Sequence, residues 1–393
     1  MKKKAIKDLL RFFQGVFFLL KFILIELKKI KQAEAVFFFP YYHTGGAEQV
    51  HVNIIKALDN MKCTVIFTEG SATMSFYKQF NENASIVELN LILNKKNRFI
   101  NELLKKSIVK SINSSQCIQY VFCSNNFYYY KILPKIKNSI KKIDLFHAFE
   151  ENDLRMINII ETASIITKRI VINNKAKLDI IKFYDNYKIP ALDYKKIEII
   201  QNGIDLGNFK HKIKNVNNIK IGFIGRWSAE KRPLIFLEIA KEINKKNPSV
   251  LFFMAGTGMK SNLEIIKNSN VEFLGEIKDK NTLNRLYEDL HFIIMPSIYE
   301  GFPMVIMESM AQGVIPIATD VGGINEHITN GENGILISDG NEKKIVDDFI
   351  NTIELLIIDN NKMEIMSKNA FEYAQSHFSI EQFNTNYRKL FNS

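Results

Sequence analysis

The amino-acid sequence predicts an α/β protein with two doubly wound halves, each a parallel sheet covered by helices. The chain has 393 residues, more than the roughly 100–200 residues of a single domain. From Ala35 onward, short β-rich runs alternate with helical segments, which is the pattern of βα units and parallel sheets. The polar stretch His211–Asn218 has no periodicity and separates the two series, so we expect a linker there.

The expected strands are short runs of β-branched and aromatic residues. In the first half they are Val36–Phe39, Thr64–Phe67, Ile86–Leu89, Ile118–Cys123, Ile143–Phe146, Arg169–Ile172 and Ile197–Ile200. In the second half they are Ile219–Ile224, Leu251–Ala255, Val271–Leu274, Phe292–Met295, Ile315–Ala318 and Gly334–Ile337. The chain ends with two expected helices, Met363–His377 and Ile380–Phe391.

Composition excludes several classes of protein. Apolar residues make up 46% and charged residues 24% of the chain, as in ordinary globular domains, and a mean hydropathy of -0.08 excludes a polytopic membrane protein. The three cysteines have no metal-ligand spacing. We therefore expect no metal site of cysteines and a reduced, cytosolic setting.

The positive charge is concentrated at the beginning of the chain. Residues 1–31 hold nine basic and two acidic side chains and so account for +7 of the net charge of +11. A nucleic-acid surface needs Lys and Arg spread over a folded face. The sequence therefore argues against nucleic acid as a partner.

The first thirty residues predict a basic amphipathic helix. On a helix, Lys7, Arg11, Gln14, Lys21 and Lys28 form one narrow polar stripe on an otherwise apolar cylinder. The broad apolar face, which would meet lipid, includes Phe13, Phe17, Leu20, Leu24 and Leu27. The polar interruptions argue against a bilayer span. The lack of an obvious small-residue cleavage site argues against a secretory signal. Two interpretations stay open: a helix that lies in the interface of an anionic membrane, or one that packs on the protein's own body or on a partner.

Glycines and cations follow the first strand of each half. Gly45 and Gly46 lie between a strand and a helix, where backbone N–H groups can approach a phosphate. In the second half, Arg226 and Lys231 lie before a helix whose first turn contains Pro233. Two cations at a helix N-terminus suit a diphosphate.

The strongest motif lies between Pro296 and Glu308. A strand ends there, Glu300 lies in the loop, and Pro303 begins a helix that carries Glu308. N–H groups at Phe302 and Met304 can meet an anion. Carboxylates beside a phosphate would repel it, so two glutamates in such a site are best explained if they bind neutral hydroxyl groups. They therefore predict sugar or ribose hydroxyls as ligands.

Together these segments resemble the retaining glycosyltransferases of family 4, which have the GT-B fold. The resemblance covers nearly all of residues 36–390, through HTGGAEQ, FHAF, QNGID, GRWSAEK, AGTG, FLGEI, PSIYEGFPMVIMESMAQG and TDVGGINEHITNGENGILI in the family's order. It implies two Rossmann-like domains facing a cleft, and the basic helix predicted from the sequence pattern precedes them in the chain. The domains expected are the helix at 1–31, an acceptor domain at 32–210, a nucleotide-sugar donor domain at 211–375, and a C-terminal helix at 376–393 that packs back on the first domain.

The resemblance also implies roles for single residues. Glu308 would bind the donor ribose and Glu300 the donor sugar, Arg226 and Lys231 would hold the diphosphate, and His147 would face the transferred sugar. Arg232 stands where the family commonly has a glycine. The backbone positions implied for donor binding are Gly45, Gly46, Gly301, Phe302 and Met304.

The implied reaction moves a hexose-type sugar from a nucleoside diphosphate to an acceptor hydroxyl with retention at the anomeric carbon. No metal or other cofactor is expected, and no protein nucleophile. The expected acceptor is a glycan or lipid-linked polysaccharide precursor, met by a peripheral protein on the cytoplasmic face of the membrane. A nucleotide-sugar epimerase of the same fold, or a non-enzymatic binder of polyanions or lipid, remain alternatives.

Overall fold

The computed structural model describes residues 19–93, 98–149 and 153–392, which form two compact units. Unit 1 contains the described residues up to Ile172, Ala176–Gln201 and the chain from Phe383 onward; unit 2 contains Asn173–Lys175 and Asn202–Gln382. The sequence placed the boundaries at 210/211 and 375/376 instead. Ile204 explains the first difference, because its N–H donates to the carbonyl of Phe378, 2.9 Å away in unit 2.

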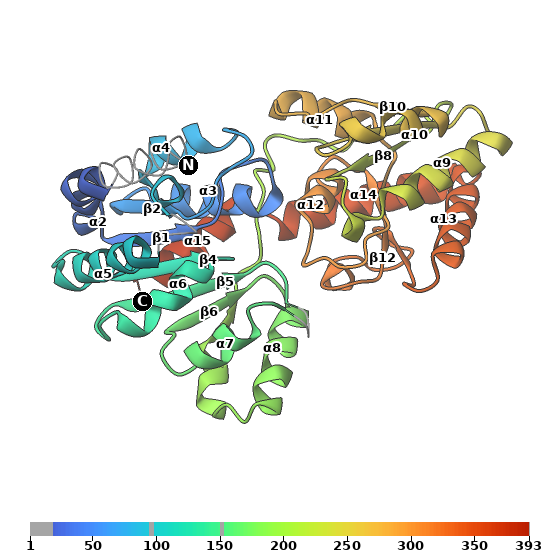
Figure 1. Ribbon diagram of the computed structural model, residues 1–393. Helices are drawn as coiled ribbons and strands as arrows, with labels where there is room; N and C mark the ends of the chain where they lie inside the picture. The colour runs from blue at the N-terminus through green and yellow to red at the C-terminus, as the bar shows by residue number, and fades with distance from the viewer. Residues whose placement is uncertain (1–18, 94–97, 150–152, 393) are drawn as a thin grey trace, which may run out of the picture. The chain divides into compact units, whose positions relative to one another are not determined.

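Unit 1 is a seven-stranded sheet in the order β3-β2-β1-β4-β5-β6-β7, with every described pair parallel (Figure 1). This order is that of a doubly wound nucleotide-binding sheet, extended by one strand. The strands are β1 Ala35–Phe39, β2 Cys63–Phe67, β3 Ser85–Glu88, β4 Tyr120–Ser124, β5 Lys141–Phe146, β6 Lys168–Val171 and β7 Ile197–Ile199. The helices between them are α3 Gly46–Ala57, α4 Tyr77–Asn83, α5 Arg98–Ser114, α6 Phe127–Ile132, α7 Met156–Thr162 and α8 Asn174–Asn186, with short 3-10 turns η2 Leu89–Leu91, η3 Leu133–Lys135 and η4 Ala191–Lys196.

The C-terminal helix α15 (Ile380–Asn392) lies beside β1 and β4 in unit 1 (Figure 1). The ring of Phe391 stacks on that of Phe37 with centroids 5.6 Å apart, and Arg388 donates to the carbonyl of Ala57 at 2.9 Å. All five residues of β1 are buried, as expected for a central parallel strand covered on both faces. The end of the chain therefore contributes to the core around its first strand.

The N-terminal segment packs partly on unit 1. Its described elements are the π-helix η1 Phe22–Glu26 and α2 Leu27–Lys31. Phe22 is fully buried and Leu27 packs against the same core, whereas Leu20 and Leu24 are 53% and 74% exposed. The expected lipid-facing side included Leu27. This prediction is wrong for Leu27, because its side chain packs against the core of unit 1. Lys7, Arg11 and Gln14 of the expected polar stripe lie outside the described residues, and no described helix has the length and apolarity to cross a bilayer.

Unit 2 is a six-stranded parallel sheet in the order β10-β9-β8-β11-β12-β13. Its strands are β8 Lys220–Ile224, β9 Leu251–Ala255, β10 Val271–Phe273, β11 Phe292–Met295, β12 Ile315–Thr319 and β13 Ile335–Ile337. Its helices are α9 Pro233–Lys246, α10 Leu263–Asn268, α11 Lys280–Asp289, α12 Met304–Met310, α13 Glu342–Ile357 and α14 Asn360–His377, with 3-10 turns η5 Ala229–Lys231, η6 Lys260–Asn262 and η7 Ile324–Glu326. Each expected strand is present with its ends shifted by at most two residues, and the prediction of two doubly wound α/β halves is confirmed.

Candidate functional site

The predicted site residues lie at the carboxyl ends of parallel strands, where open α/β sheets bind their ligands. In unit 2, Arg226 follows β8 and Glu300 follows β11. In unit 1, Gly45 follows β1 and His147 follows β5. Each unit therefore has its own group of candidate residues.

Lys231 and Glu300 form an ion pair in unit 2. The Lys231 ammonium donates to Oε1 of Glu300, and the hydroxyl of Ser297 donates to the same oxygen at 2.7 Å. Both charged side chains are largely buried, at 19% and 8% exposure. The structure thus brings together two residues for which the sequence predicted separate ligand groups.

Arg226 is the accessible cation of the same loop. Its side chain is 61% exposed, and its guanidinium reaches Oε1 of Glu230 only at 3.4 Å. A long, exposed pair of this kind contributes little to stability. Arg226 can therefore turn toward an anion at small cost.

Arg232 has the left-handed backbone conformation that favours glycine. Its φ of 46° lies at the N-cap of α9, immediately before Pro233, and a side chain at positive φ is strained. The guanidinium bonds to Oδ1 of Asp339 at 2.7 Å. The positive φ is a physical reason for a glycine at this position. The Arg232 side chain binds Asp339 and does not add to the two cations Arg226 and Lys231.

Two glycine motifs support these loops from neighbouring strands. A Cβ on Gly256 would lie 1.7 Å from the carbonyl oxygen of Gly225, and a Cβ on Gly322 would lie 1.6 Å from that of Glu300. Both glycines have positive φ. The motifs around them therefore permit close backbone packing beneath Arg226 and Glu300, and no direct ligand role is required to explain them.

Glu308 lies on α12 and is bound by a residue that the sequence did not single out. The hydroxyl of Tyr287, on α11, donates to Oε2 of Glu308 at 3.0 Å. Burial raises the pKa of Glu308 to about 7, although the hydrogen bond from Tyr287 opposes the rise. A carboxyl group with this pKa exchanges a proton near neutrality and accepts bonds from hydroxyls best when ionised.

Gly301 and Phe302, between the two glutamates, make structural contacts, whereas the start of α12 has N–H groups that a ligand could use. The carbonyl of Gly301 accepts from Gly323 N–H at 2.9 Å, and the buried Phe302 ring packs on His327 with centroids 4.2 Å apart. In the described chain, α12 begins at Met304 with no side-chain cap. The N–H groups of Ile306 and Met307 donate to the carbonyl of Pro303, so an N–H group that is open to water or a ligand would be that of Met304 or Val305. The sequence placed Pro303 at the first helical residue, whereas it is the N-cap.

The glycine loop of unit 1 carries a carboxylate of its own. Gly45 is the N-cap of α3, and a Cβ there would lie 2.1 Å from Oε2 of Glu48. The other oxygen of Glu48 lies 3.6 Å from Nε2 of His43. The negative charge of this carboxylate opposes an anion that approaches the N-terminus of α3.

His147 forms a pair with a second histidine. Its Nε2 lies 3.0 Å from Nε2 of His51, which lies on α3. Burial, and then the charge of Arg155, lower the pKa of His147 to about 3. His147 is therefore a neutral imidazole that can donate or accept one hydrogen bond. No local sequence signal points to His51, which lies among apolar residues of α3.

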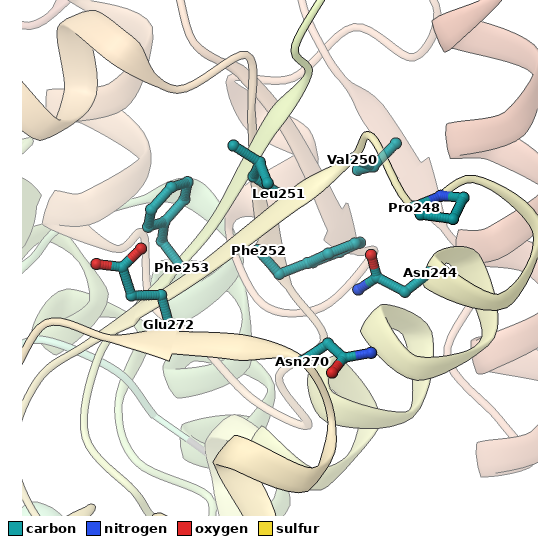
Figure 2. Close-up of a pocket in the computed structure, with 8 residues that line it drawn as sticks. All are labelled: Asn244, Pro248, Val250, Leu251, Phe252, Phe253, Asn270 and Glu272. Atoms are coloured by element: carbon teal, nitrogen blue, oxygen red, sulfur yellow. The ribbon is translucent and has the colours of Figure 1, made fainter.

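A separate hollow of about 340 Å³ lies at the amino ends of β9 and β10 (Figure 2). It contains none of the predicted site residues. Since parallel sheets bind ligands at the opposite ends of their strands, it does not belong to the candidate site. Its lining residues are Asn244, Pro248, Val250, Leu251, Phe252, Phe253, Asn270 and Glu272.

Comparison with known proteins agrees with this geometry. Residues 218–355 match the family model of the "Glycosyl transferases group 1". The chain is 28% identical over 257 residues to an Escherichia coli UDP-Gal:alpha-D-GlcNAc-diphosphoundecaprenol alpha-1,3-galactosyltransferase, covering 59% of this chain and 63% of that protein. It is 26% identical to an uncharacterized glycosyltransferase of Methanocaldococcus jannaschii, covering 89% of this chain and 95% of that protein. A capsular polysaccharide biosynthesis glycosyltransferase of Staphylococcus aureus is 25% identical, with 57% of this chain and 58% of that protein covered, so the chain spans about three fifths of the length of two of these relatives.

Solved structures share the fold over most of both chains. Anabaena HepE in complex with UDP superposes with a TM-score of 0.71 at 18% identity, covering 91% of this chain and 99% of that one. A glycosyltransferase from Rickettsia africae superposes with a TM-score of 0.67 at 19% identity, covering 92% and 98%. The second half of the chain is thus similar to the group 1 glycosyltransferases, and the whole chain has the GT-B fold of two Rossmann-like domains.

Proposed function

We propose that this protein is a retaining glycosyltransferase of family 4 that transfers a sugar from a nucleoside-diphosphate sugar to an acceptor hydroxyl. The observation that supports this most strongly is the pairing of Lys231 with Glu300 beside the accessible Arg226. A cation for a diphosphate and a carboxylate for sugar hydroxyls lie on neighbouring loops of one sheet edge. This combination fits a ligand that carries both groups.

In this proposal unit 2 holds the donor. Arg226 and Lys231 meet the diphosphate and stabilise the charge that develops on it as the sugar leaves. Removal of one preorganised hydrogen-bond donor from such a site typically costs about 2.7–4 kcal/mol. Glu308 accepts the ribose hydroxyls and Glu300 those of the sugar. Gly301, Phe302 and Met304 add backbone N–H groups. No metal enters the proposed reaction, because the two cations supply the required positive charge.

Unit 1 supplies the groups for the transferred sugar. Since its pKa is about 3, His147 serves as a neutral hydrogen-bonding group and not as a general base at physiological pH. The acceptor proton passes to an oxygen of the leaving diphosphate on the same face of the sugar. No protein nucleophile is required, and Gly45 and Gly46 add backbone near the diphosphate.

We propose a glycan or lipid-linked acceptor at the cytoplasmic face of a membrane. The Escherichia coli relative is named for a diphosphoundecaprenol-linked substrate. In this chain Leu20, Ile23 and Leu24 are exposed beside Lys21 and Lys28, a combination suited to an anionic lipid interface. Nucleic acid has no place in this proposal.

The test is a transfer assay. A panel of nucleotide sugars is incubated with a lipid extract of the source organism, and products are identified by mass spectrometry. The proposal expects sugar to be added to an extracted acceptor. Conversion of the donor sugar without any acceptor would favour an epimerase, and salt-sensitive polyanion binding without nucleotide binding would favour a non-enzymatic protein.

A further inference from the structure

His51 is buried in the middle of α3 and held between two aromatic rings. It has no exposed surface, and its ring lies parallel to that of Phe39 on β1, with centroids 4.1 Å apart and an interplanar angle of 3°. On its other side, its Nε2 is 3.0 Å from Nε2 of His147. Stacking on Phe39 fixes the plane of the ring, and the contact with His147 holds Nε2 toward that residue.

The pair of nitrogens shares one proton. Burial lowers the pKa of both histidines, so neither ring is an imidazolium at neutral pH. A hydrogen bond between two neutral imidazoles needs one Nε2 that bears hydrogen and one that does not. Whichever tautomer His51 adopts, His147 must adopt the other.

The second nitrogen of His51 decides between the two arrangements. Its Nδ1 is buried and has no hydrogen-bond partner among the described residues. If Nδ1 bore the hydrogen, an N–H donor would be buried without an acceptor, which is rarer in proteins than an unpaired acceptor. The hydrogen of His51 therefore lies on Nε2 and is donated to His147.

We propose that His51 is a positioning residue that fixes the tautomer of His147, so that His147 accepts at Nε2 and carries its own hydrogen on Nδ1. This inference rests on the proposed function, in which His147 bonds to the transferred sugar. His147 then offers the sugar a donor, Nδ1–H, in a defined direction. Arg155, which donates to the carbonyl of the adjacent Ala148 at 3.0 Å, disfavours a second proton on the ring.

The tautomer is measured directly by nitrogen-15 NMR of the histidines in the full-length protein. The His147 signals are assigned by their loss in His147→Asn. We expect hydrogen on Nδ1 and none on Nε2 at pH 7. In His51→Leu, which removes the donor at similar size, we expect the Nε2–H tautomer to appear. His51→Gln, which can donate from nearly the same place, should restore the parent tautomer.

Kinetics give the second readout. His51→Leu should lower kcat by roughly tenfold or more, as loss of an outer hydrogen-bond partner does at metal-bound histidines, and leave the affinity for nucleoside diphosphate unchanged. His51→Gln should recover most of the loss, and Val52→Ala, a matched packing change on the same helix, should keep the parent kcat and tautomer. Hydrogen on Nε2 of His147 in the parent, or an unaltered tautomer in His51→Leu, would overturn the inference. Because the NMR result does not depend on transfer, absence of any sugar transfer would contradict the proposed function alone.

Discussion

The ammonium group of Lys231 donates to the same Glu300 oxygen that accepts from Ser297. The cation predicted for the diphosphate and the carboxylate predicted for the sugar therefore neutralise each other in unit 2. A nucleotide sugar that binds here has to bond to Lys231 and Glu300 in addition to, or in place of, their bond to each other. Substitution of either residue consequently affects the other.

Glu300→Gln releases Lys231 from its carboxylate. We predict that nucleoside diphosphate affinity, measured by calorimetry, stays the same or increases, because Lys231 becomes more available to an anion. Turnover with the complete donor should fall at least about tenfold, since a carboxylate that bonds to sugar hydroxyls is lost, and hydrogen bonds to charged groups are worth about 1.5–3 kcal/mol. Parent turnover in this variant would remove Glu300 from the site.

The double substitution of Arg226 and Lys231 by alanine tests the cation pair. We predict at least a tenfold loss of nucleoside diphosphate affinity in calorimetry, from charge-assisted contacts worth roughly 1.5–3 kcal/mol each. Lys245→Ala, which removes an exposed cation from the other end of α9, is the matched control and should bind as the parent does. Equal affinity in the double variant and the control would show that the diphosphate binds elsewhere.

Glu308 makes donor binding depend on pH. Its pKa of about 7 lies above the ordinary value, so the folded protein binds a proton there below pH 7. Because ribose hydroxyls donate to the ionised form, binding releases that proton, and affinity should fall by up to about tenfold for each pH unit below 7. The ligand should be a nucleotide sugar, whose esterified diphosphate does not titrate between pH 5 and 8.

Two variants check that the dependence comes from Glu308. In Glu308→Gln affinity should be weaker and flat with pH. In Tyr287→Phe the midpoint should move to higher pH, because the lost donor had lowered the pKa of Glu308. A slope that persists in Glu308→Gln would assign the titration to another group.

The sequence predicted the sheets because their signals are local. Buried parallel strands are short apolar runs, and β1 with its five buried residues is typical. Pro233 marked the start of α9 in the same way. The resemblance to a family added the roles of the cations and glutamates, and these roles stay predictions at the level of single residues.

The partners of the site residues could not be predicted, since they come from distant parts of the chain. Tyr287 and Glu308 lie on different helices, and the four strands β2, β3, β4 and β5 lie between His51 and His147 in the sequence. Leu27 was assigned to a lipid-facing side because its helical position fits that side, and only the fold shows that it covers the core of unit 1. Amphipathic periodicity alone does not say which surface is covered.

Membrane binding is tested at the exposed leucines of the N-terminal segment. We predict that Leu20→Gln with Leu24→Gln reduces sedimentation with anionic phosphatidylglycerol vesicles, because about 1.5–3 kcal/mol of burial is lost for each side chain. Deletion of residues 1–29 is a poorer test, since Phe22 belongs to the core. Leu355→Gln with Ile358→Gln, two exposed apolar residues of unit 2, is the control. Equal sedimentation of both double variants would reject the segment as the membrane contact.

The central claim, transfer of a sugar from a nucleotide donor with retention, is tested most directly by the anomeric configuration of the first product. Proton NMR of the transferred sugar, recorded during early turnover with an α-linked donor and a defined acceptor, reports this configuration through the coupling of the anomeric proton. The proposed retaining mechanism predicts an α-linked product. A β-linked product would contradict retention, and an unchanged acceptor with every donor tested would contradict the transferase itself.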